Sequence, residues 1–108
     1  MTAYNFGDIL LVGFPHTDLR KVSKRPAFVI YDADDLDILV ARITTQEYIT
    51  GADYKIIEWR RSGLIAESFV RLSKQATIEK KYIIRKLGTL AKSEQENIKS
   101  VLREIFKL

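Results

Sequence analysis

Short apolar segments bounded by polar turns recur from residue 7 to residue 87, with no helical pattern between them. Their valine, isoleucine and aromatic residues favour β-strands, and the missing crossover helices argue against a parallel sheet. The pattern predicts a small twisted barrel or a half-open sheet. The expected strands cover residues 7–14, 27–31, 38–43, 54–59, 64–72 and 82–87, with a short strand or turn near Thr77.

The last part of the chain has a different periodicity. Ile98, Val101, Leu102 and Ile105 recur at helical spacing, and Ser93 and Glu96 match a capping box. We therefore expect an amphipathic helix over residues 93–107, packed on the sheet. With 108 residues, the chain has room for one domain, residues 1–108.

The net charge of +4 is unevenly distributed. Four of the basic residues lie between two expected strands: Arg20, Lys21, Lys24 and Arg25. Such a cluster suits a polyanionic partner, although charge runs are more often simply solvated surface. No apolar run is long enough to span a membrane and no signal peptide is evident, so a cytoplasmic protein is expected.

Several kinds of site have no support in the sequence. The chain contains no cysteine and a single histidine, His16, which is a poor basis for a zinc site, and it has no glycine-rich phosphate loop. We expect neither a metal nor a cofactor. Tyr54 and Trp59 are interpreted as core residues, with base stacking as the alternative.

Three positions have both a structural and a functional interpretation. Arg25 is held extended by Pro26. Either it is a surface base whose stem packs on the sheet, or its guanidinium binds phosphate bidentately. Thr44 and Thr45 end a strand, where they are either β-formers or hydroxyl donors to phosphate and sugar oxygens. Arg71 lies among apolar residues, so its side chain points outward, reaches solvent with its tip or meets an anion. The pattern favours the outward orientation, and composition alone decides none of these alternatives.

Four motifs, in order, resemble the MazF/PemK-type toxins of bacterial toxin–antitoxin pairs. The opening, GDILLVGFPHTDLRKVSKRPAFVIY, has the family's Gly-Asp, apolar strand, Pro/Thr-containing loop and Arg-Pro-Ala. The segments ITTQ, SFVRLSKQATIEKKYIIRKLGTL and SEQENIKSVLREIF follow, so the resemblance covers nearly the whole chain. It implies an SH3-like barrel and a homodimer. It also implies a metal-independent endoribonuclease that cleaves single-stranded mRNA, and an antitoxin partner with which the toxin binds DNA.

The resemblance also assigns residues. It implies that Arg25 is the catalytic arginine, Thr44 the catalytic threonine and Arg71 a strand arginine of the PemK branch, in which an aspartate follows two residues later. Ser73 stands at that position. The departure raises the alternative of a weak or inactive barrel that binds RNA or a protein.

The residues near the basic loop complete the hypothesis. His16 and Asp18 are the titratable groups there and are the candidates for proton transfer. The expected RNA-binding residues are Arg20, Lys21, Lys24, Thr45, Gln46 and Ser73. An acidic, apolar antitoxin segment would compete with RNA for the same basic groove.

Overall fold

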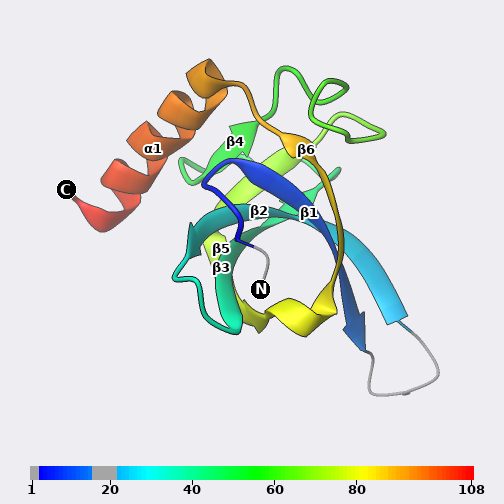
Figure 1. Ribbon diagram of the computed structural model, residues 1–108. Helices are drawn as coiled ribbons and strands as arrows, with labels where there is room; N and C mark the ends of the chain where they lie inside the picture. Colours follow the sequence, from blue (N-terminus) through cyan, green and yellow to red (C-terminus); the bar gives the residue numbers. More distant parts are fainter. Residues whose placement is uncertain (1–2, 16–21) are drawn as a thin grey trace.

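The computed structural model describes residues 3–15 and 22–108, which form a six-stranded antiparallel sheet and a C-terminal helix (Figure 1). Strand order in the sheet is β4-β5-β3-β2-β1-β6. Among the described residues β4 and β6 are its two edges, so the sheet is curved but open and not a closed barrel. The elements are β1 (Asp8–Pro15), β2 (Val22–Asp32), β3 (Asp37–Thr44), β4 (Asp53–Lys55), β5 (Phe69–Glu79), the 3₁₀ turn η1 (Lys80–Tyr82), β6 (Ile83–Thr89) and α1 (Lys92–Phe106).

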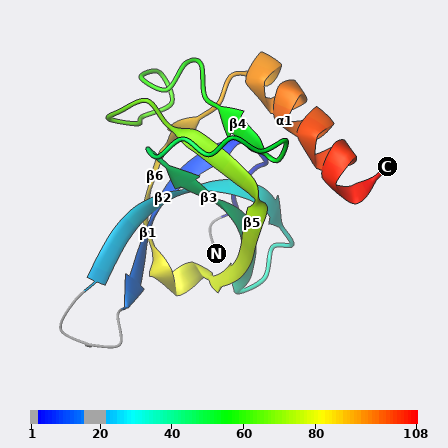
Figure 2. The ribbon, with the colours of Figure 1, turned by 180° about the vertical axis from the view of Figure 1, so that it is seen from behind.

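The mainly β prediction is confirmed, as is the half-open form of the sheet. Helix α1 lies beside β4 in both views of the ribbon, and the paired ends of β1 and β2 project beyond the rest of the sheet (Figures 1 and 2). Within residues 3–15 and 22–108, no helix combines the length and apolar character that a membrane span needs.

The strands predicted at 54–59 and 64–72 are wrong in extent, because β4 has three residues and β5 begins only at Phe69. Much of the segment between them forms tight turns, in which the Ser62 N–H donates to Glu58 O at 3.1 Å and the Leu64 N–H donates to Trp59 O at 3.1 Å. Leu64 is buried there without joining the ladder, whereas other apolar residues of this stretch, such as Ile65, are exposed. Apolar spacing indicates that a residue such as Leu64 is buried, but it does not show whether a strand or a loop carries it.

Both faces of the sheet are covered, as the continuous apolar run of β1 indicates. One cluster of buried residues faces α1 and the loop before β5: Ile9, Phe28, Ala41, Ile43, Ile56, Leu64, Val70, Leu72, Leu90 and Ile98. Tyr54 and Trp59 pack against this cluster, which agrees with their interpretation as core. The second cluster lies on the opposite face: Leu10, Val12, Ala27, Val29, Ile38, Val40 and Ile78.

Helix α1 occurs where it was expected, but the capping box is wrong. The N-cap is Ala91, without a side-chain cap, because the helix begins earlier than the Ser93 pattern predicts. Glu94 is turned inward, 2% exposed, and its carboxylate accepts hydrogen bonds from the Tyr54 hydroxyl at 2.9 Å and the Ile57 N–H at 2.6 Å. The first turn of α1 therefore anchors the loop after β4 instead of capping itself.

The acidic turn between β2 and β3 contains a buried ion pair. Asp32 has a 1% exposed side chain that lies 2.8 Å from the Lys80 ammonium and accepts the N–H groups of Tyr4 and Asp34, both at 2.8 Å. Burial by itself raises the pKa of Asp32, but these hydrogen bonds and the Lys80 charge outweigh it and lower the pKa below its ordinary value of 3.8.

This lowered pKa predicts a loss of stability in acid. A carboxylate with a depressed pKa in the folded state stabilises fully above its unfolded pKa and loses that contribution as pH falls through the folded value. We expect wild type to be more stable than Asp32→Asn near pH 6, and the difference to shrink below pH 3.8, as followed by thermal unfolding at several pH values. Parallel pH profiles for the two proteins would contradict the assignment.

Candidate functional site

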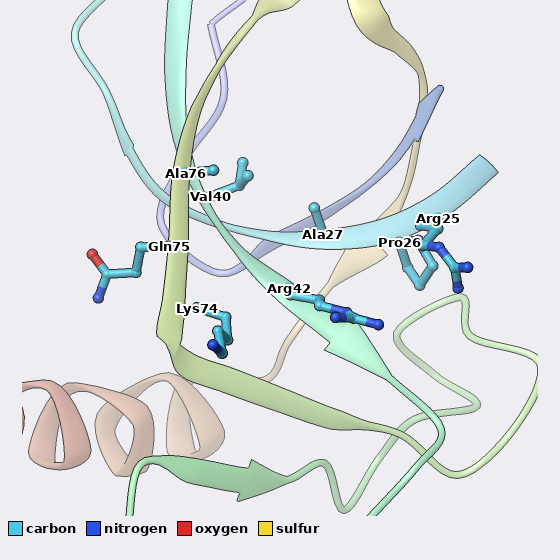
Figure 3. Close-up of a pocket in the computed structure, with 8 residues that line it drawn as sticks. All are labelled: Arg25, Pro26, Ala27, Val40, Arg42, Lys74, Gln75 and Ala76. Atoms are coloured by element: carbon cyan, nitrogen blue, oxygen red, sulfur yellow. The ribbon is translucent and has the colours of Figure 1, made fainter. Parts of the chain in front are cut away.

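A cavity of about 280 Å³ opens between β2, β3 and β5, at the end of the second core cluster. Its floor is apolar, and Figure 3 shows Arg42 on β3 lying between Lys74 on β5 and Arg25 on β2. The lining residues are Arg25, Pro26, Ala27, Val40, Arg42, Lys74, Gln75 and Ala76. The site is thus an apolar hollow with a cationic rim, and we call it the cationic cavity.

Strand register places the rim arginines. Ala27 on β2 pairs with Arg42 on β3, so both side chains belong to the same face of the sheet. Arg25 lies within β2 opposite Val12, in the extended conformation that Pro26 predicts. Continuing the β2–β3 register by two residues aligns Arg25 with Thr44, the last residue of β3.

A bulge in β5 brings the third cation to the rim. Ala41 pairs with Gln75 and the next residue, Arg42, pairs with Arg71, so residues 72–74 have no partner on β3. The Gln75 side-chain amide donates to the Leu72 carbonyl at 2.8 Å and closes the bulge. Bulges re-aim side chains, and here Lys74 lines the cavity while Ser73 is exposed and lies outside the lining.

The rim charges are uncompensated within the part of the chain that the structure describes. None of Arg25, Arg42 and Lys74 forms an ion pair with a described carboxylate. Arginine offers a rigid fork that matches phosphate oxygens, and lysine offers a compact point charge. Charges above an apolar floor suit an anionic ligand that also has a flat apolar part.

The strand-end threonine is half-buried and lies outside the cavity lining. The Thr44 hydroxyl oxygen accepts the Gln46 N–H at 3.1 Å, which leaves its own proton free to donate to another group. Thr45 and Gln46 are exposed, and the Gln46 side chain accepts the Tyr48 hydroxyl at 3.2 Å. Thr44 is therefore placed at the end of β3 as expected, and its turn is connected to Tyr48.

Arg71 does not point outward, so the orientation favoured by the sequence pattern is wrong. Its side chain is only 12% exposed, and its Nε–H donates to Oδ1 of Asp53 at 3.1 Å. Its guanidinium carbon lies 3.7 Å from the ring centroid of Tyr48. The buried arginine meets an anion, as charge burial requires.

The remaining predicted residues divide into two groups. Lys24 is exposed on β2, opposite Gly13. His16, Asp18, Arg20 and Lys21 lie outside the described residues. Among the described residues, no group of histidine, aspartate or glutamate side chains could hold a metal ion.

Sequence reasoning missed four residues of this region. Arg42 is the single charge inside the apolar run ILVARI, and that exception was a usable signal. Lys74 reaches the rim only through the bulge, and Asp53 and Tyr48 reach Arg71 only through the pairing of β4 with β5 and the loop before it. No local pattern indicates those three.

Several solved structures share this architecture. An endoribonuclease in complex with its cognate antitoxin from mycobacterial species superposes with a TM-score of 0.77 at 14% identity, over 98% of this chain and 97% of that one. The Mycobacterium tuberculosis toxin MazF-mt6 gives 0.77 at 19% identity, over 94% and 97%. An endoribonuclease from mycobacterial species gives 0.76 at 16% identity, over 100% and 95%. These likenesses establish the shared fold.

Sequence comparison supplies the family. A search of curated protein sequences found no match. The family model described as "PemK-like, MazF-like toxin of type II toxin-antitoxin system" matches residues 5–106, nearly the whole chain, and confirms the resemblance seen in the motifs. The chain therefore belongs to the PemK-like, MazF-like family of type II toxin–antitoxin toxins.

Proposed function

We propose that this protein is a toxin that cleaves single-stranded RNA, with the cationic cavity as part of its RNA-binding site. The observation that carries the proposal is the rim of Arg25, Arg42 and Lys74, uncompensated by described carboxylates and set above an apolar floor. A nucleotide offers matching groups, because its phosphate is anionic and its base is flat. The toxin family and the endoribonuclease names of structures that share the fold support this reaction class.

The reaction needs charge stabilisation more than any special nucleophile. The RNA 2′-hydroxyl loses a proton and attacks the adjacent phosphorus, the bond to the 5′-oxygen breaks, and that oxygen takes up a proton. Negative charge grows on the non-bridging oxygens meanwhile. The Arg25 guanidinium would hold those oxygens bidentately, and the free Thr44 proton would donate to one of them.

Arg42 and Lys74 extend the site along the nucleic acid backbone. Their separate strands allow them to bind neighbouring phosphates, which adds salt-sensitive affinity. No described lining residue of the cavity carries a carboxylate or an imidazole. His16 or Asp18, outside the described residues, stays our proposed candidate for proton transfer.

The proposed setting follows the family. The toxin would act in the cytoplasm as a homodimer and be inhibited by an antitoxin, as the mycobacterial endoribonuclease structure with its cognate antitoxin suggests. An acidic antitoxin segment would compete with RNA, because a carboxylate and a phosphate seek the same arginine fork.

A cleavage assay in a metal chelator tests the proposal. We expect the protein in EDTA to cut a single-stranded RNA oligonucleotide, leaving a 2′,3′-cyclic phosphate and a 5′-hydroxyl, and not to cut the same sequence made as DNA. Mass spectrometry of the fragments identifies the ends. Salt-sensitive RNA binding with no cleavage would instead support a non-catalytic barrel, the alternative that Ser73 raises.

A further inference from the structure

A row of charged side chains crosses the sheet next to the cationic cavity. Asp53 on β4 pairs with Arg71 on β5, and Arg71 pairs with Arg42 on β3. Residues directly opposite one another in a sheet project from the same face. Arg71 therefore lies between a carboxylate on one side and a rim arginine of the cavity on the other.

The Arg71 guanidinium is held on two sides. Its Nε–H donates to Asp53 Oδ1 at 3.1 Å, and Tyr48 lies against its flat face at 3.7 Å from guanidinium carbon to ring centroid. The second carboxylate oxygen of Asp53 accepts the Thr50 hydroxyl at 2.6 Å, and the Asp53 side chain is 3% exposed. Asp53 is thus itself fixed, and rotation of the Arg71 head would break both contacts.

These contacts leave one part of the guanidinium available. The Nε–H donates to Asp53, and one flat face of the guanidinium lies against the Tyr48 ring. The two terminal NH₂ groups have no described hydrogen-bond partner. Those terminal groups can donate to an anion.

The charge balance of the row depends on the same carboxylate. Arg71 and Arg42 are opposite one another, and like charges at opposed positions repel. Asp53 neutralises Arg71, whereas Arg42, on the cavity rim, pairs with no carboxylate of the described residues. Without Asp53, two uncompensated arginines would share one row and the Arg71 head would be driven towards solvent.

The same cluster reaches the strand-end threonine. The Tyr48 hydroxyl donates to the Gln46 side chain, and the Gln46 N–H donates to Thr44. A change at Arg71 can therefore pass through Tyr48 to the turn that orients Thr44.

We propose that Asp53 is a positioning residue for RNA cleavage. From β4, together with Tyr48, it fixes the Arg71 guanidinium and the Thr44 turn in position beside the cationic cavity. This inference rests on the proposed endoribonuclease function. The resemblance implies an aspartate at position 73, where this chain has Ser73. Asp53 instead places a fixed carboxylate beside the strand arginine, Arg71.

The test compares Asp53→Asn with a matched control that removes the carboxylate partner of another residue of β4. The asparagine side chain would keep the shape but lose the charge, and we expect kcat for RNA cleavage to fall about 10- to 100-fold, as small misplacements of positioning groups do. The Kd for a non-cleavable 2′-deoxy oligonucleotide should not weaken, because the rim cations that bind phosphate are unchanged and the substitution removes a negative charge. Glu67→Gln removes the partner of Lys55, also on β4, and should leave both quantities unaltered.

Two further measurements separate the possible failures. Tyr48→Leu removes the other side of the clamp from a half-buried loop position, and it should lower kcat without changing Kd even if Asp53→Asn fails to fold. Wild-type kcat in a folded Asp53→Asn or Tyr48→Leu protein would overturn the positioning role while leaving the proposed function intact. A wild-type protein that cuts no RNA would overturn the proposed function itself.

Discussion

Replacing Arg25 with alanine is expected to reduce RNA cleavage at least about 100-fold, the scale seen when one preorganised donor to a developing oxyanion is removed. The side chain is exposed on β2 and pairs with no described carboxylate, so its removal leaves no buried group unsatisfied. The fold should survive, as circular dichroism and thermal unfolding would show. The loss of cleavage would then come from the missing guanidinium and not from unfolding.

Two control variants make this result specific. Arg25→Lys keeps the charge but loses the bidentate fork, so it should recover only part of the activity. Arg85→Ala removes the same charge from an exposed position on the edge strand β6, outside the cavity lining, and should cleave like wild type. Equal cleavage by Arg25→Ala and Arg85→Ala would remove Arg25 from the mechanism.

Replacing Gly63 with alanine is expected to lower the free energy of unfolding by at least about 2 kcal/mol, the scale of backbone strain plus a forced shift. Gly63 has φ +86°, a conformation that residues with a Cβ rarely adopt. An added Cβ would also lie 2.1 Å from the Leu87 carbonyl oxygen, which is backbone and cannot rotate away. The loop before β5 would have to move off β6.

A second glycine provides a control for this variant. A Cβ added at Gly51 would have no neighbouring atom within 4 Å, so Gly51→Ala should change stability by no more than about 0.5 kcal/mol. Urea unfolding of the two variants measures both effects. If Gly63→Ala proved as stable as Gly51→Ala, the close approach of this loop to β6 would be wrong.

Local features of the chain were sufficient for much of the architecture. Apolar segments without intervening helical patterns predicted a mainly β fold, and the spacing of apolar residues near the C-terminus predicted α1. The Arg-Pro pair predicted extended backbone at Arg25, which lies in β2. Each of these depends on a residue and its near neighbours, because propensity and periodicity act over a few residues.

The candidate site was only partly predictable for the same reason. Arg25 and Thr44 were proposed through a resemblance that preserves the order of motifs, and Arg25 lines the cavity. Lys74 reaches the cavity through a bulge that no residue type predicts. The strands predicted at 54–59 and 64–72 were wrong in extent, because loop residues that pack into the core can be as apolar as strand residues.

By itself the sequence determined that this chain forms strands, ends in a helix and carries a cationic segment beside an extended arginine. Only the tertiary structure decided which charges are paired: Arg71 is neutralised by Asp53, 18 residues away, whereas Arg42 pairs with no carboxylate that the structure describes. Pairing between strands far apart in sequence sets that difference, because a side chain's charge is balanced by its neighbours in space.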